Sequence, residues 1–208
     1  MNGIFARSCC IAGAALLLGA CTASAHISSN VTQDANRAPR RMFVASHLLD
    51  LSKGPNFGPL FAKGFDARLA ESLRICGTEV ILKETTGIDL ETERLAPKIQ
   101  AFKPDTMMVV SATHATVDGK GEPMNATFDV DLFESSANWS AAKPAKQPPL
   151  RAVWRSSVSF APGRTFQPMD DGKVVADTVI ERLQEDGFFP DCQPAPTEPA
   201  ERADNAGQ

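Results

Sequence analysis

The chain has 208 residues, of which 43% are hydrophobic and 22% are charged, and its formal net charge at pH 7 is −4. This length is enough for one domain with a substantial hydrophobic core. The mild acidic balance argues against a nucleic-acid partner, because proteins that bind nucleic acids present clustered basic residues.

Residues 1–20 are predicted to be an export signal peptide. Arg7 supplies a positive charge near the start, and an apolar stretch follows from Ile11 to Leu18. That stretch is too short to span a bilayer, which takes about 20 apolar residues. We therefore expect this segment to be absent from the mature protein.

The end of the segment, Leu18-Gly19-Ala20-Cys21, resembles the lipobox of bacterial lipoproteins. The resemblance implies cleavage before Cys21, a diacylglyceryl thioether on its sulfur, and acylation of the new amine by a fatty acid such as palmitate. Several acyl chains anchor a protein far more firmly than one chain does. In this class an Asp after the cysteine favours the inner membrane, so Thr22 implies the periplasmic face of the outer membrane.

A second cleavage site lies just beyond the lipobox. Ala23-Ser24-Ala25 fits the small-residue pattern of ordinary signal cleavage, and a cut after Ala25 would release a soluble protein without Cys21. The lipobox is favoured because its cysteine falls at the end of the apolar region, after a pair of small residues.

The mature chain is predicted to have three parts: a lipidated flexible tether at 21–41, a single α/β periplasmic domain at 42–192, and a disordered tail at 193–208. Residues 22–41 are polar and without periodicity, and the tail is rich in Pro, Ala and acidic residues. Neither composition can bury enough apolar surface to build a core.

An apolar stripe predicts the first helix of the domain. The stripe repeats every four residues, at Phe61, Phe65, Leu69 and Leu73, and Cys76-Gly77 marks its end. Flanking strands are predicted at 42–45 and 79–82, and a weaker helix, interrupted by a proline, at 90–102.

Sheet signals dominate from residue 106 onward. A strand is predicted at 106–116, a glycine-containing hairpin at 117–123, and an alternating strand from Met124 to Leu132. A long loop from Ser135 to Leu150 precedes a strand at 151–160, which places Trp154 on its apolar face. The final helix is predicted at 173–186, after Asp170-Asp171.

The hairpin register follows from the pattern of apolar residues, because a slip of one residue would turn every side chain to the opposite face. The predicted pairs on the buried face are Met108 with Leu132, Val110 with Val130, Ala112 with Phe128, and His114 with Ala126. On the reverse face they are Ser111 with Asp129 and Thr113 with Thr127.

The predicted fold class is α+β, in the order β-α-β-α-β-β-β-α, with helices packed on a mixed and mostly antiparallel sheet. The order resembles the amino-terminal domain of the Tol propeller protein, lipoproteins that activate penicillin-binding proteins, and curli-secretion lipoproteins. The residues that carry this resemblance are Lys103-Pro104-Asp105, Asp118-Gly119, Asp129-Val130-Asp131-Leu132 and Val153-Trp154-Arg155. None of them is a catalytic signature.

Two cysteines remain in the domain, Cys76 and Cys192. Because the periplasm is oxidising, we predict a disulfide between them; two buried free thiols are the alternative. A loop of this length would stabilise the fold by about 4–5 kcal/mol in the chain-entropy view.

No catalytic constellation is expected, and we predict that the protein is not an enzyme and uses no metal or cofactor. Ser46, His47 and Asp50 are close in sequence, but adjacent residues of an extended segment point to opposite faces. His114 is interpreted as a solvent-exposed residue at the rim of the hairpin. The sequence contains no HExxH, GxSxG or phosphate-binding glycine motif.

The polar face of the predicted sheet is the candidate binding face, and it carries Ser111, Asp129, Asp131 and Arg155. An ordinary solvated face, with cross-strand Arg–Asp pairs, would explain the same pattern. The functional interpretation is a docking surface for another envelope component.

Two functions are therefore considered. The first is a membrane-anchored periplasmic lipoprotein, attached to the bilayer through Cys21, that acts as a protein-interaction module in envelope assembly or maintenance. The second is a periplasmic binder of a small molecule or glycan, using the loop from Ser135 to Leu150 and Trp139. A bare sheet edge would favour the first function, and a groove lined by that loop would favour the second.

Overall fold

The computed structural model describes residues 23–32, 34–48, 57–85, 95–119, 121, 123–135, 150–163, 167–190 and 192. The predicted export signal at 1–20, Cys21, the tail at 193–208 and the segment 136–149 with Trp139 lie outside the described residues. No helix of the described ranges is long and apolar enough to cross a membrane.

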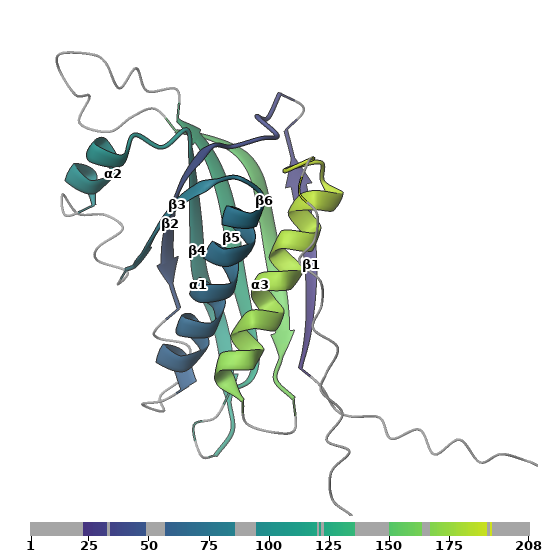
Figure 1. Cartoon of the computed structure of the whole chain (residues 1–208). Helices are drawn as coiled ribbons and strands as arrows, with labels where there is room; N and C mark the ends of the chain where they lie inside the picture. Colours follow the sequence, from purple (N-terminus) through teal and green to yellow (C-terminus); the bar gives the residue numbers. More distant parts are fainter. Residues whose placement is uncertain are drawn as a thin grey trace, which may run out of the picture.

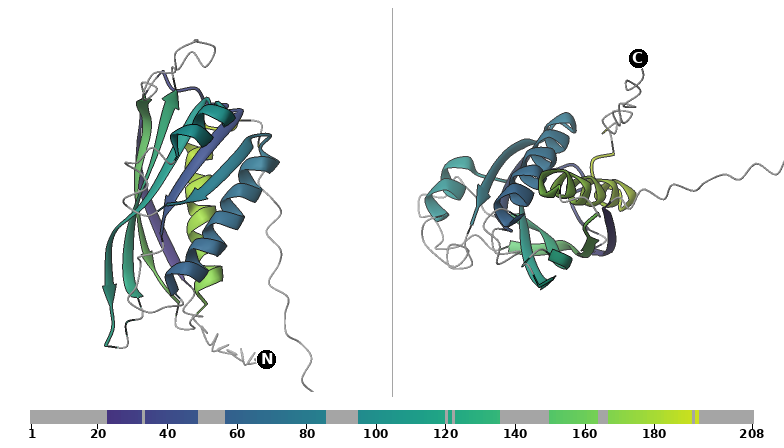
Figure 2. Two further views of the ribbon diagram at one scale, coloured as in Figure 1. Left: turned by 90° about the vertical axis from the view of Figure 1, so that its left-hand side faces the viewer. Right: turned by 90° about the horizontal axis from the view of Figure 1, so that it is seen from below.

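A six-stranded mixed sheet carries two long helices, α1 and α3, side by side on one face (Figures 1 and 2). The strand order is β1-β6-β5-β4-β2-β3, with β2 parallel to both β3 and β4 and the other neighbours antiparallel. The elements are β1 (Ser24–Val31), β2 (Arg41–His47), α1 (Phe57–Ile75), β3 (Glu79–Glu84), α2 (Ala96–Phe102), β4 (Thr106–Val117), β5 (Pro123–Ser135), β6 (Leu150–Ala161) and α3 (Pro168–Glu185). The predicted α+β class and element order are confirmed, with one strand added at the start.

That added strand, β1, corrects the prediction of a flexible tether. Residues 24–31 pair with β6 along their whole length, from Ser24 opposite Ala161 to Val31 opposite Trp154. The side chains alternate between exposed and partly buried, and Ile27 is among those packed against the core. The alternation is weak in the sequence because only two of the four inward positions, Ile27 and Val31, hold large apolar residues, whereas Ala25 and Ser29 are small.

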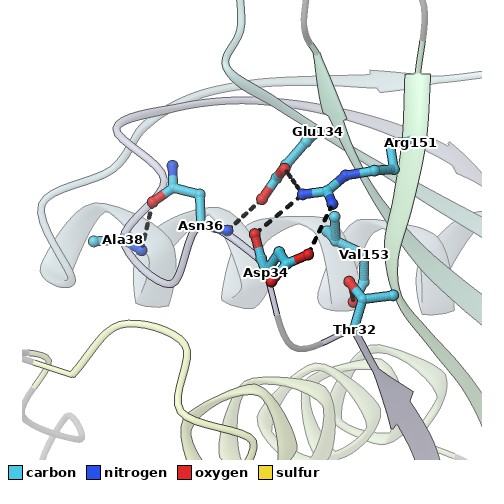
Figure 3. Close-up of polar contacts among 7 residues, drawn as sticks. All are labelled: Thr32, Asp34, Asn36, Ala38, Glu134, Arg151 and Val153. Atoms are coloured by element: carbon cyan, nitrogen blue, oxygen red, sulfur yellow. Dashed lines mark hydrogen bonds and ion pairs between the residues drawn. The ribbon is translucent and has the colours of Figure 1, made fainter.

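The described residues of the rest of the expected tether, 32 and 34–40, are also held in place (Figure 3). The Thr32 amide donates to the Val153 carbonyl oxygen at 2.9 Å. The Arg151 guanidinium contacts the Glu134 carboxylate at 2.7 Å and the Asp34 carbonyl oxygen at 3.0 Å, and Glu134 also accepts from the Asn36 amide. Polar residues of this segment form hydrogen bonds with the ends of β5 and β6. The polar composition, from which a flexible tether is predicted, instead reflects these contacts.

The main core lies between the sheet and the two long helices. The α1 stripe of Phe61, Phe65, Leu69 and Leu73 is fully buried, as its spacing predicts. The apolar stripe of α3 is buried on the same side of the sheet. The α1 and α3 backbones meet at two glycines, Gly64 and Gly172, where there is no room for a side chain.

The predicted β4–β5 register is confirmed over its first half. Met108, Val110 and Ala112 pair with Leu132, Val130 and Phe128, and Ser111 pairs with Asp129. A bulge then follows at Thr113, so His114 pairs with Thr127 and Ala115 with Ala126. The predictions for Thr113 and His114 are therefore wrong. The extra residue turns the small Ala115, in place of an imidazole, toward the core.

Two helix boundaries differ from prediction. α2 begins at Ala96, so Pro97 lies in the first turn. Amide groups there have no acceptor within the helix, so the missing amide hydrogen of proline costs no hydrogen bond. α3 begins at Pro168, which places Asp170 and Asp171 inside its first turn; acidic residues there are favoured by the helix dipole.

The disulfide between Cys76 and Cys192 is confirmed, with the two Cα atoms 4.5 Å apart. It joins the residue after α1 to the segment that follows α3. The bond therefore ties the two long helices together at one end, which excludes the alternative of two free thiols.

Candidate functional site: the open face of the sheet

The two faces of the sheet are covered unequally. α1 and α3 cover one face, whereas the only described helix on the other side is the short α2 (Figure 2). α2 places Phe102 in a small second core with Phe43, Ala45 and Met107. Beyond this small core, the face formed by β1, β6 and β5 carries polar side chains.

The strand register places this polar face in rows that cross the sheet. One row runs from β1 to β2 and consists of Ser28, Ser157, Asp129, Ser111 and His47. The next row begins with Asn30, Arg155 and Asp131. The four residues predicted as a binding face thus lie together on one surface, within two adjacent rows.

A shallow polar groove of about 410 Å³ follows these rows. Asp129, Asp131 and Arg155 line it, and Ser111 lies next to Asp129 in the register. The remaining lining residues are Ser28, Ser29, Asn30, Ser156 and Ser157. Those from β1 were missed by the sequence analysis, because their segment was predicted to be a tether.

The charged side chains of the groove influence one another electrostatically but make no close contact. Among the described residues, no hydrogen bond or ion pair within 4 Å joins Arg155 to Asp129 or Asp131. Burial raises the pKa of the Asp131 carboxyl, Arg155 opposes this, and Asp129 adds to it. Arg155 therefore acts on Asp131 through its charge at longer range, without a close ion pair between them.

A second polar cluster lies on the helix side of β1, directly behind the groove. Ser29 donates to the Asp186 carboxylate and accepts from the Arg182 Nε, and Trp154 Nε1 donates to Asp186 Oδ2 at 2.7 Å. Burial raises the pKa of Asp186, but these hydrogen bonds and the charge of Arg182 outweigh it and lower the pKa below its ordinary value. Every member is occupied within the fold, so we interpret the cluster as structural.

The residues of the sequence-level triad do not come together as one. Ser46 is fully buried on the helix side of β2, whereas His47 belongs to the row on the opposite face and its Nδ1 donates to the Thr85 carbonyl oxygen at 2.8 Å. Asp50 lies outside the described residues. His114 is exposed near the hairpin, as predicted. Within the described ranges, no group of three or more His, Cys, Asp or Glu side chains is placed to hold a metal.

Two acids of the long helices have carboxyl groups shielded from solvent: Asp171 in α3, whose pKa burial raises to about 6, and the half-buried Asp66 in α1. Burial raises the pKa of Asp66 in α1 to about 7; the hydroxyl of Ser46 lowers it somewhat, and the nearby Glu84 raises it further. Oδ1 of Asp66 and the Ser46 hydroxyl are both buried, and neither makes a hydrogen bond with a described residue. Ser46 therefore stabilises the charged form of Asp66 only weakly. At mildly acidic pH the Asp66 carboxyl is therefore protonated and uncharged in the folded protein.

Asp66 should make the fold more stable at pH 5 than at pH 8. Because the folded state holds this proton up to about pH 7 and an unfolded Asp releases it near pH 3.8, stability falls as the pH rises between these values. The full difference is on the order of a few kcal/mol. Asp66→Asn should reduce, but not abolish, the dependence of the urea midpoint on pH, because Asp171, whose pKa burial raises to about 6, acts in the same direction. Glu181→Gln, at an exposed position of α3, should leave it intact; equal slopes in Asp66→Asn and the parent would contradict the prediction.

The fold and this surface define a class: an α+β domain with one face of its sheet covered by two long helices and the other face largely open and polar. No protein-family model and no curated protein matches the sequence. Several solved structures are similar in architecture.

The first similar structure is a subunit of the PelC dodecamer from Paraburkholderia phytofirmans, 12% identical, with 77% of this chain and 98% of that chain covered and a TM-score of 0.45. A DUF4136 family protein from Bacteroides thetaiotaomicron is 10% identical, with 79% and 98% covered and a TM-score of 0.41. Lipoprotein GNA1162 from Neisseria meningitidis is 17% identical, with 69% and 96% covered and a TM-score of 0.39. Likeness at this level assigns no function, and the resemblance to the Tol propeller and curli-secretion proteins stays a prediction.

Proposed function

We propose that the protein is a lipoprotein of the outer membrane, anchored through Cys21 on the periplasmic side, and that it docks another envelope protein at the β1 side of its sheet. The observation that carries this proposal is the bare edge of β1, which no described strand covers and which borders the polar groove. No catalytic role is proposed for any residue.

The position of β1 supports the lipoprotein cleavage over the alternative one. A cut after Ala25 would remove Ser24 and Ala25, which pair with Ala161 and Phe160 in the sheet. Ala25 also packs against the core. A cut before Cys21 leaves the strand whole, so the lipobox is the processing site that suits the fold.

The edge of β1 is suited to accept a partner strand. Its eight residues, SAHISSNV, include no Lys, Arg, Asp, Glu or Pro, the residues that usually protect exposed edges from pairing. A strand added there would form backbone hydrogen bonds with β1. Arg155 on β6 would then lie about 10 Å from the added strand, within reach of a long acidic side chain of the partner, and Asp131 would lie one strand farther away.

Binding of a small hydrophilic molecule or glycan is the second candidate. The groove volume of about 410 Å³ lies in the range of small-ligand sites. Such sites are usually concave and largely apolar, however, whereas this one is shallow and lined by serine, asparagine and charged residues. The loop with Trp139 that the sequence analysis assigned to this function lies outside the described residues.

The anchor is tested with Cys21→Ala. This variant should lose palmitate labelling and should no longer be recovered with outer membranes on a density gradient. Unchanged labelling and fractionation would overturn the anchor, whatever the behaviour of the folded domain.

Docking is tested by crosslinking in cells with the double variant Asp131→Lys, Arg155→Glu. The variant reverses two of the three charges that line the groove without touching the core, so it should fold and be anchored normally but lose its crosslinked protein complexes. Glu181→Lys, exposed on α3, is the control and should keep them. Complexes that survive the double variant would contradict docking at this face. A soluble sugar whose thermal stabilisation of the parent disappears in the double variant would establish the second candidate instead.

A further inference from the structure

We infer that one end of this domain rests directly on the membrane surface. This end, called here the hairpin end, comprises the start of β1, the β4–β5 hairpin and the first turns of α1 and α3. The inference rests on the proposed lipid anchor at Cys21, and it goes further by fixing which part of the domain meets the lipid.

The first step is the length of chain between anchor and fold. Ala23 already packs against the core and β1 starts at Ser24, so only Thr22 separates Cys21 from the folded domain. Two Cα–Cα steps reach at most about 7 Å. β4 alone has 12 residues, a length of about 40 Å at the rise of a β-strand. The linker is therefore much shorter than the domain, so the domain cannot be separated from the bilayer surface.

The second step is the sheet topology, which determines which strand and helix ends lie at the same end of the domain as the start of β1. β1 is antiparallel to β6, and β6 and β4 run in the same direction because β5 is antiparallel to both. The end where β1 starts is therefore the end where β4 and β6 finish. α1 and α3 also start there, because they follow β2 and β6, which run parallel to β4 (Figure 1).

The third step is the surface of that end. Met124, next to the hairpin, is 56% exposed, and Leu60 in the first turn of α1 is 38% exposed. Apolar exposure alone does not choose between the ends, since Ile75 and Leu150 are similarly exposed at the far end. The position of the anchor decides which end faces the membrane. It places Met124 and Leu60 near the lipid and Ile75 and Leu150 far from it.

This orientation has a consequence for the docking surface. β1 runs away from the membrane, with Ser24 nearest to the lipid and Val31 farthest from it. The Cys76–Cys192 disulfide lies at the distal end, after α1 and α3 have crossed the sheet. A protein that pairs with β1 must then itself approach the membrane surface.

The experiment uses the full-length lipidated protein in vesicles of phosphatidylethanolamine and phosphatidylglycerol. The photo-crosslinking residue benzoylphenylalanine is placed at Met124 in one protein and at Leu150, its matched exposed position at the far end, in another. After illumination, protein–lipid adducts measured by intact mass should be several-fold more abundant at position 124 than at position 150.

A second variant tests whether the short linker between Cys21 and the domain causes the excess of adducts at position 124. Ten Gly and Ser residues inserted between Thr22 and Ala23 would add a flexible segment with a mean span of about 17 Å. The insertion should keep palmitate labelling and membrane recovery but reduce the adducts at position 124 to the level found at position 150. A lipidated, membrane-bound protein with equal adducts at both positions, or with adducts unaffected by the insertion, would overturn this inference alone. Absence of lipid on Cys21 would overturn the proposed anchor as well.

Discussion

Replacing Trp154 by alanine is expected to lower the free energy of unfolding by about 3–5 kcal/mol, the usual effect of removing a large buried aromatic side chain. Trp154 is only 1% exposed and is among the largest fully buried side chains of the described core. The substitution would also remove the indole donor to Asp186, whose lowered pKa depends in part on that hydrogen bond. A loss of this size is a large share of the total stability of a domain, so little folded protein should accumulate in cells.

Two further variants separate packing from hydrogen bonding. Trp154→Phe keeps an aromatic ring but removes the donor to Asp186, so it should be destabilised less than Trp154→Ala. Leu150→Ala, at a 42% exposed position of the same strand, should change stability by less than about 0.5 kcal/mol. Urea unfolding measures all three, and a change below about 1 kcal/mol in Trp154→Ala would contradict the burial of this residue.

The elements that the sequence predicted well are those with strong periodicity in large apolar residues. The helical stripe of Phe61, Phe65, Leu69 and Leu73 can lie on only one face of a helix, so both the helix and its buried side followed. The alternation along β5 fixed the register from Met108 to Ala112 in the same way. The prediction failed at Thr113, because a bulge inserts one residue without leaving an apolar pattern.

The candidate site was predicted only in part, for a physical reason that concerns β1. Asp129, Asp131 and Arg155 alternate with buried residues on their own strands, so their common face could be inferred. Ser28 and Asn30 belong to a strand in which only two of four inward positions are large and apolar, and that strand is held in place by pairing with β6. Backbone pairing between segments far apart in the sequence leaves no local pattern of residues that could predict it. Without the pairing of β1 with β6, the side of the groove that β1 forms could not be inferred.

The contact between the two long helices was also invisible in the sequence, because a glycine in a helix usually indicates only lower helix propensity. Ideal Cβ atoms at Gly64 and Gly172 would lie 2.0 Å from the Met169 carbonyl oxygen and 2.2 Å from the Phe61 carbonyl oxygen. Both clashes are with backbone atoms, which cannot rotate away as a flexible side chain can. The two helices therefore approach each other as closely as their backbones allow.

Gly172→Ala is accordingly expected to destabilise the protein by about 1–3 kcal/mol or more, since the helices must separate to admit one methyl group. Helix propensity alone predicts the opposite sign, a gain of about 1 kcal/mol for Ala over Gly. The sign of the measured change thus distinguishes close helix packing from an exposed glycine. Gly119→Ala, with no atom within 4 Å of its new Cβ, is the control and should change stability by less than about 0.5 kcal/mol. Urea unfolding of both variants decides the matter: a Gly172→Ala protein as stable as the parent would mean that α1 and α3 do not meet at this glycine.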